Sequence, residues 1–137
     1  MNAAATVRAY LAAMEARDLA AAQALLAPGF TMQFPGPVTF TSLAQLIEWA
    51  RPRYRFVRKV YERFDEVPIS DNTAASGTVV YCYGTLAGEW PEGTPFGGIR
   101  FIDRFTVINR LLADQSVWND LAEVRQHHSG KPAKAAG

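Results

Sequence analysis

The sequence predicts an α+β fold, in which a curved antiparallel sheet wraps around N-terminal helices to form a cone. Three observations predict it. Apolar residues recur at helical spacing in the first part of the chain. Later segments alternate apolar and polar residues, as strands do. Helices and strands are also separated along the chain, which is the order typical of α+β proteins. The open mouth of such a cone is where small molecules bind.

The size and composition of the chain indicate one globular domain. At 137 residues and 49% hydrophobic residues, the chain is long and apolar enough to bury a single core. We expect one domain over residues 1–128 and a mobile C-terminal tail over residues 129–137, where Gly, Pro, Ala and Lys follow no periodicity. The single cysteine, Cys82, excludes an internal disulfide and is expected to be a buried small hydrophobe.

The charge and the absence of certain motifs narrow the function classes. A net charge of +1 predicts no attraction to nucleic acid or to a membrane surface. We find no apolar run long enough to span a membrane and no secretory signal, so a cytoplasmic location is expected. No His, Cys, Asp and Glu cluster has metal-ligand spacing, and no glycine-rich phosphate loop is present, so we expect no metal and no cofactor.

Two helices are expected at the N-terminus. Residues 3–16 are rich in alanine and place one apolar stripe at helical spacing, made of Val7, Tyr10, Leu11 and Met14. Residues 19–26 form a second helix, for which Asp18 is a plausible N-cap, and the Pro28-Gly29 pair ends it.

A short strand and a third helix follow. Residues 30–34 alternate apolar and polar side chains, and residues 38–40 add a stub of strand. Thr41 or Ser42 can cap a helix that runs to about residue 54, with a proline in its last turns that kinks or stops it.

The rest of the chain is expected to be sheet. Residues 56–68 form a strand whose charged residues, Lys59 among them, indicate that much of it faces water. Residues 73–87 carry apolar groups on both faces, which is typical of a central, strongly curved strand. Residues 88–98 form a hairpin loop, and residues 98–126 form two strands and a short closing helix.

Two aspartates in these last strands are the candidate catalytic residues. Asp103 shares a strand face with Phe101, Phe105 and Val107, because successive strand side chains alternate sides. Asp120 shares a face with Trp118 in the same way. If both faces line one cavity, two carboxylates meet in an apolar pocket, where pKa values are pushed apart or upward.

Each aspartate also has a structural interpretation. Asp103 could pair with Arg100 or Arg104 at the sheet surface. Asp120 precedes an apolar-periodic run and could cap the closing helix. The sequence leaves both alternatives open.

The chain resembles the SnoaL-like branch of the nuclear-transport-factor-2-like superfamily over roughly residues 4–127. Four segments carry the resemblance: Ala-Arg-Asp-Leu with Leu-Leu-Ala-Pro-Gly-Phe at residues 16–19 and 25–30, the helix that begins near Ser42, the strand–loop–strand from Tyr83 to Phe101, and Val-Trp-Asn-Asp-Leu-Ala-Glu-Val at residues 117–124. The resemblance implies the cone-shaped fold. It does not imply one activity, because the superfamily mixes isomerases, dehydratases, cyclases and hydrolases.

The resemblance also implies roles for some residues. Trp118-Asn119-Asp120 resembles the Trp-Arg-Asp of limonene epoxide hydrolases and the last-strand acid of SnoaL-type cyclases, which implies a catalytic Asp120. The ketosteroid isomerases of this fold use a tyrosine and two acids. By that resemblance, Tyr10, Tyr81 or Tyr83 would supply the phenol, and Asp103 and Asp120 the acids.

Two functions fit these observations. One is a pocket protein for a small apolar organic ligand, with cofactor-free acid–base chemistry such as isomerisation, dehydration, cyclisation or hydrolysis. Its expected ligand contacts are Tyr10, Met14, Trp49, Tyr81, Tyr83, Phe105 and Trp118. The other is a non-catalytic binding or scaffold module. A homodimer through the sheet exterior is expected, and the sequence does not decide whether the protein is an enzyme.

Overall fold

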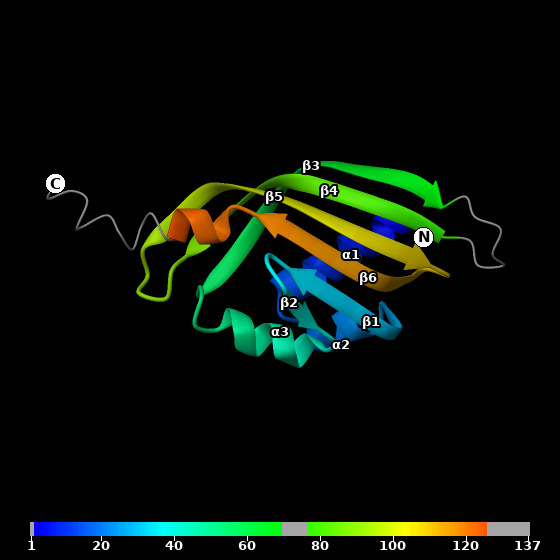
Figure 1. Cartoon of the computed structure of the whole chain (residues 1–137), viewed down its shortest axis with the longest axis horizontal. Coiled ribbons are helices and arrows are strands. Elements are labelled where there is room, and N and C mark those ends of the chain that lie inside the picture. The colour runs from blue at the N-terminus through cyan, green and yellow to red at the C-terminus, as the bar shows by residue number, and fades with distance from the viewer. Residues whose placement is uncertain (1, 70–76, 126–137) are drawn as a thin grey trace, which may run out of the picture.

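The computed structural model describes residues 2–69 and 77–125, which form helices packed against one sheet (Figure 1). Residues 121–125 are helical after the last strand. The turn expected at residues 70–72 and the tail expected at residues 129–137 lie outside the described residues. The elements are, in chain order, α1 (Ala3–Glu15), α2 (Leu19–Gln23), β1 (Leu26–Phe34), β2 (Val38–Phe40), α3 (Leu43–Ala50), β3 (Phe56–Ile69), β4 (Gly77–Glu89), β5 (Pro95–Ile108) and β6 (Leu111–Asn119).

The strands form a six-stranded sheet in the order β2-β1-β6-β5-β4-β3. β4 lies between β5 and β3, in the internal position that its two apolar faces predict. One pair differs from the expected antiparallel arrangement, because β1 and β6 are parallel. These two strands are far apart in the chain, and so a long connection is available to bring them side by side in the same direction.

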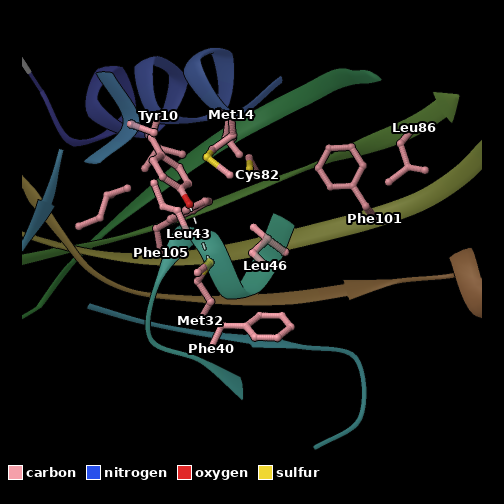
Figure 2. Close-up of a cluster of buried hydrophobic side chains, with 14 of the residues drawn as sticks. Tyr10, Met14, Met32, Phe40, Leu43, Leu46, Cys82, Leu86, Phe101 and Phe105 are labelled. Carbon is pink, nitrogen blue, oxygen red and sulfur yellow. Dashed lines mark hydrogen bonds between the residues drawn. The ribbon is translucent and has the colours of Figure 1, made fainter. Parts of the chain in front are cut away.

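The helices lie on one side of the sheet, and the sheet curves around α1 (Figure 1). Asn2 caps α1, because its side-chain oxygen accepts a hydrogen bond from the Ala5 amide at 2.7 Å. The predicted stripe of α1 is buried against the concave face of the sheet. Figure 2 shows Tyr10 and Met14 pointing into this core, toward Phe105 of β5 and Met32 of β1.

Two element boundaries differ from the sequence-based expectation. α2 ends at Gln23, and β1 begins at Leu26, so the residues expected to end a helix belong to a strand. The strand accommodates Pro28 and Gly29 as an irregularity, with a register shift between Leu26 and Thr31 and a φ of 80° at Gly29. α3 ends at Ala50 rather than near residue 54, because Pro52 cannot continue a helix.

A bulge in β6 decides which side chains of that strand face inward. Thr106 of β5 pairs with Asp114, and the next residue of β5, Val107, pairs with Leu112, so Ala113 is an extra residue. The alternation of faces shifts by one position at this point. Leu112 is buried before the bulge, and the buried residues after it have odd numbers.

No helix within the described ranges is long and apolar enough to cross a membrane.

Candidate functional site

A cavity of about 170 Å³ lies between the helices and the concave face of the sheet. It is similar in size to an engineered cavity of about 150 Å³ that binds benzene. Its walls are mostly aromatic and aliphatic, and the polar side chains among them are Glu15, Arg17, Arg53, Lys59, Gln115 and Asn119. The cavity can hold a compact organic molecule of about the size of one or two rings.

Three elements place most of these side chains by simple periodicity. α1 brings Tyr10 and Met14 to the wall from adjacent turns of one helix face. β3 contributes every second residue from Val57 to Tyr61, with Lys59 between them. After its bulge, β6 does the same with Gln115, Val117 and Asn119.

The polar centre of the site is an ion pair between Lys59 of β3 and Asp103 of β5. Lys59 Nζ lies 2.7 Å from Asp103 Oδ2, and the two side chains are 19% and 0% exposed. Nζ also lies 4.7 Å from the centre of the Phe101 ring. The second carboxylate oxygen of Asp103, Oδ1, is buried and accepts no hydrogen bond from the described residues.

The charge state of Lys59 follows from this pairing. Burial acts to lower the pKa of the Lys59 amine, but the charge of Asp103 and the hydrogen bond to it outweigh burial, so the pKa is raised. Lys59 is therefore an ammonium group at neutral pH. It can donate hydrogen bonds into the cavity, and it is not a free amine that could act as a nucleophile.

The structure places Asp103 in the apolar interior rather than in a surface pair with Arg100 or Arg104. It lies behind Lys59 and is not itself part of the cavity wall. The expectation that Lys59 faces water is wrong, because Lys59 belongs to the inward series of β3. Its position between the apolar residues Val57 and Tyr61 was the signal that could have shown this.

Asp120 lies outside the cavity, so the expected meeting of two carboxylates in one hollow is not found. Its Oδ2 accepts a hydrogen bond from Arg100 Nε at 2.6 Å, and the side chains of Arg100 and Asp120 are 82% and 36% exposed. Asp120 also occupies the N-cap position of the closing helix, because its carbonyl accepts a hydrogen bond from the Val124 amide at 3.0 Å, and the neighbouring Asn119 Oδ1 accepts one from the Leu121 amide at 3.0 Å. The bulge at Ala113 turns the even-numbered residues of β6 outward, and Asp120, the residue after β6, continues that series.

The expected ligand contacts divide into two groups. Tyr10, Met14 and Trp49 line the cavity, and Phe105 is buried behind Tyr10, with ring centres 6.0 Å apart. The others do not line the cavity: Tyr81 and Tyr83 alternate with the inward residues of β4, and Trp118 is 51% exposed.

Of the three tyrosines expected to supply a phenol, Tyr10 is the one that lines the cavity. Its hydroxyl points to the sulfur of Met32 at 3.9 Å, a long contact, as the dashed line in Figure 2 shows. Burial, and then the charge of Asp103, raise the pKa of Tyr10. It therefore stays protonated and can donate a hydrogen bond.

Sequence reasoning missed several polar residues of the wall. Gln115 and Arg53 each keep one buried polar atom, Oε1 and Nε, without a hydrogen-bond partner in the described part of the chain. No residue pattern marks them, because the bulge before Gln115 and the end of α3 before Arg53 decide where they point. Residues 2–69 and 77–125 contain no group of three or more His, Cys, Asp or Glu side chains that could hold a metal ion.

A curved sheet that encloses a cavity with N-terminal helices defines the nuclear-transport-factor-2-like class, and solved structures agree. An NTF2-like protein of unknown function from Burkholderia pseudomallei has a TM-score of 0.73 at 19% identity, over 92% of this chain and 96% of that chain. The chain belongs to the SnoaL-like domain family, whose model matches residues 7–118. None of the curated proteins matches its sequence.

Two similar structures contain organic ligands. TerC, co-crystallised with polyporic acid, has a TM-score of 0.66 at 15% identity, over 88% of this chain and 93% of that chain. The orange carotenoid protein of Anabaena (Nostoc), which binds canthaxanthin, has a TM-score of 0.65 at 18% identity, over 85% of this chain and 35% of that chain. At these identities the likeness shows the fold alone.

Proposed function

We propose that this protein binds a compact, mostly apolar organic molecule in the cavity, with an oxygen atom of the ligand facing Lys59. The observation that carries the proposal is the cavity itself, in which the ammonium group of Lys59 stands among aromatic and aliphatic walls. The organic ligands of TerC and of the orange carotenoid protein support the same kind of ligand by analogy.

The number of N–H donors on Lys59 indicates that the ligand carries an oxygen acceptor. An ammonium group has three N–H donors, and Asp103 Oδ2 takes one of them. The others serve the cavity side, where a carbonyl or phenolic oxygen can accept them. A hydrogen bond to a charged group contributes about 1.5–3 kcal/mol, which is enough to discriminate a ketone from a hydrocarbon of the same shape.

The best probes are therefore a matched ketone and hydrocarbon, 1-indanone and indane. We expect 1-indanone to bind at least about tenfold more tightly by calorimetry. The difference should vanish in the Lys59→Met/Asp103→Leu double variant, which removes both charges together. It should persist in Arg58→Met, since Arg58 is an exposed neighbour outside this cavity. Equal binding of the two probes, or failure of both, would refute the contact between Lys59 and a ligand oxygen.

One further observation favours acid–base chemistry in the same site. Glu15 is the carboxylate of the cavity wall among the described residues, and its Oε2 accepts a hydrogen bond from the Lys59 backbone amide at 3.3 Å. We propose that Glu15 removes a proton next to a ligand carbonyl, and that Lys59 stabilises the enolate oxygen. Asp103 is assigned to holding Lys59 in position. Asp120 is not part of this arrangement.

Exchange of deuterium from solvent into the carbon next to the carbonyl of 1-indanone tests this chemistry. We expect exchange above the buffer rate in the unaltered protein and a return to that rate in Glu15→Gln, with binding retained. Glu48→Gln is the matched control, because Glu48 is an exposed residue of α3 outside the cavity. Binding without any exchange would mean that the protein binds the ligand but does not catalyse this proton transfer.

We also propose that the protein is a homodimer that uses the convex face of the sheet. Ile102 of β5 and Trp118 of β6 are paired in register on this face, and both are exposed. Exposed aromatic and aliphatic side chains of this kind are typical of interfaces. Light scattering should show a dimer that Trp118→Glu converts to a monomer and that Leu19→Glu, on α2, leaves intact. A monomer in the unaltered protein would contradict it.

A further inference from the structure

Arg53 is a cation of the cavity wall that has no anionic partner within residues 2–69 and 77–125. It follows α3, and its guanidinium group stacks on the Trp49 ring at 4.1 Å from the ring centre. Its Nε is buried and donates no hydrogen bond to the described residues. Burial lowers the pKa of Arg53, the positive charge of Arg125 lowers it further, and Tyr54 acts in the opposite direction.

The two neighbouring arginines each have an anionic partner, unlike Arg53. Arg51 pairs with Glu48 at 2.7 Å, and Arg55 pairs with Glu89 at 3.5 Å. Both point into solvent, where an ion pair adds little. Arg53 is the most buried of the three and forms no such pair with any residue that the structure describes. A partly buried cation without an acceptor is costly unless a ligand supplies one.

Arg17 adds a third cation to the same wall, beside Lys59 and Arg53. It follows α1 with a φ of 58°, a left-handed conformation in which glycine is normally found. Its Nη1 donates a hydrogen bond to the Met14 carbonyl at 2.6 Å, and the residue lines the cavity. A side chain that occupies a glycine position at the edge of a cavity indicates a role for that side chain.

Gln115 supplies an unsatisfied acceptor on the wall. It is 5% exposed, and its Oε1 has no hydrogen-bond donor in the described part of the chain. A buried acceptor of this kind costs about 1–3 kcal/mol when it is left unpaired. A hydroxyl group on a ligand would satisfy it.

From these residues we infer that the ligand is a carboxylate-bearing ring compound, an amphipathic organic anion. Its carboxylate is held by Arg53 and Arg17, and a hydroxyl group donates to Gln115. The guanidinium fork matches a carboxylate in shape as well as in charge. This inference rests on the proposed function and specifies the ligand class for the same cavity. Lys59 does not supply the anion site, because Asp103 already balances its charge.

The test compares 4-hydroxybenzoate with 4-hydroxybenzamide, which have nearly the same shape and differ in charge. We expect calorimetry at low salt to show the carboxylate binding at least tenfold more tightly. Arg53→Gln should reduce this preference to less than about threefold. Arg51→Gln is the matched control, because it removes the same charge two residues away from a side chain outside the cavity, and it should keep the preference.

The hydroxyl part of the inference has its own comparison. Benzoate, which lacks the hydroxyl group, should bind severalfold more weakly than 4-hydroxybenzoate in the unaltered protein. In Gln115→Leu, which removes the acceptor, the two should bind alike. Circular dichroism of each variant confirms that the comparison is made on folded protein.

The outcomes separate this inference from the proposed function. Equal binding of the carboxylate and the amide, or a preference that survives Arg53→Gln, overturns the anion site and leaves the cavity as a site for neutral ligands. Failure of both these probes together with 1-indanone refutes the proposed function, and the anion site with it.

Discussion

Asp103 and Asp120 each form one close ion pair, and the two pairs have nearly the same length in different surroundings. The Lys59–Asp103 contact is 2.7 Å and is enclosed by the concave side of the sheet. The Arg100–Asp120 contact is 2.6 Å and lies on the wet exterior. Distance therefore does not measure the importance of an ion pair. The surrounding solvent does, because it decides how much an unpaired charge would cost.

The difference between the two regions originates in strand geometry rather than in residue type. Asp103 belongs to the inward series of β5, and this alternation continues without a break through Phe101 and Phe105. On β6 the extra residue Ala113 reverses the alternation, so Asp120 emerges on the outside. The one inserted residue, Ala113, therefore decides that Asp120 forms its ion pair on the surface, whereas Asp103 forms its pair in the interior.

The largest expected effect comes from breaking the buried pair. Lys59→Met keeps the length of the side chain and leaves the Asp103 carboxylate unpaired in an apolar interior. We expect a loss of roughly 3–5 kcal/mol in the free energy of unfolding, measured by urea denaturation at neutral pH.

Two variants act as controls for this comparison. Arg100→Met breaks the exterior pair in the same way and should leave the urea midpoint almost unchanged. Lys59→Met/Asp103→Leu removes both buried charges and should be more stable than Lys59→Met alone. An equal loss for Lys59→Met and Arg100→Met would show that the two pairs are energetically alike, against the argument made from burial.

A second prediction concerns the thiol of Cys82, which lies beside Asp103 in the strand register and is fully buried. Burial, and then the charge of Asp103, raise the pKa of Cys82 to about 12. Because the thiolate is the reactive form, we expect a thiol reagent at pH 8 to react roughly a thousandfold more slowly with the native protein than with the protein unfolded in urea. Cys82 is the single cysteine of the chain, so absorbance of the reagent reports it directly.

Rapid reaction of the native protein would show that the concave side opens to solvent easily, which would weaken the contrast with the exterior. The same pKa shift predicts alkaline instability. Below the ordinary pKa of the thiol, the raised pKa contributes fully to the stability of the folded protein. This stabilisation is lost as the pH rises toward about 12.

Local signals in the sequence predicted most helices and strands, and they predicted the apolar strand face on which Asp103 lies. The stripe of α1, the cap of α3 at Ser42 and the apolar face around Asp103 all follow from periodicity and capping, and the structure confirms them. The partner Lys59 was missed because charge was given more weight than strand alternation. Trp118 and Asp120 were expected to face the cavity because they share a strand face, but a shared face does not show on which side of the sheet it lies.

The smallest expected effect lies at Arg17, where the cavity meets the surface. Arg17→Gly and Arg17→Ala both remove the side chain, and they differ only in how well the backbone accepts a φ of 58°. The glycine variant should be more stable than the alanine variant by about 1 kcal/mol, measured by thermal or urea unfolding. Both should bind 4-hydroxybenzoate more weakly than the unaltered protein. Equal stability of the two variants would mean that the left-handed conformation costs nothing here, and Arg17 would then give no reason to expect a role at the cavity. A stability gain that accompanies weaker binding would instead show that this position keeps an unfavourable backbone for the sake of its side chain.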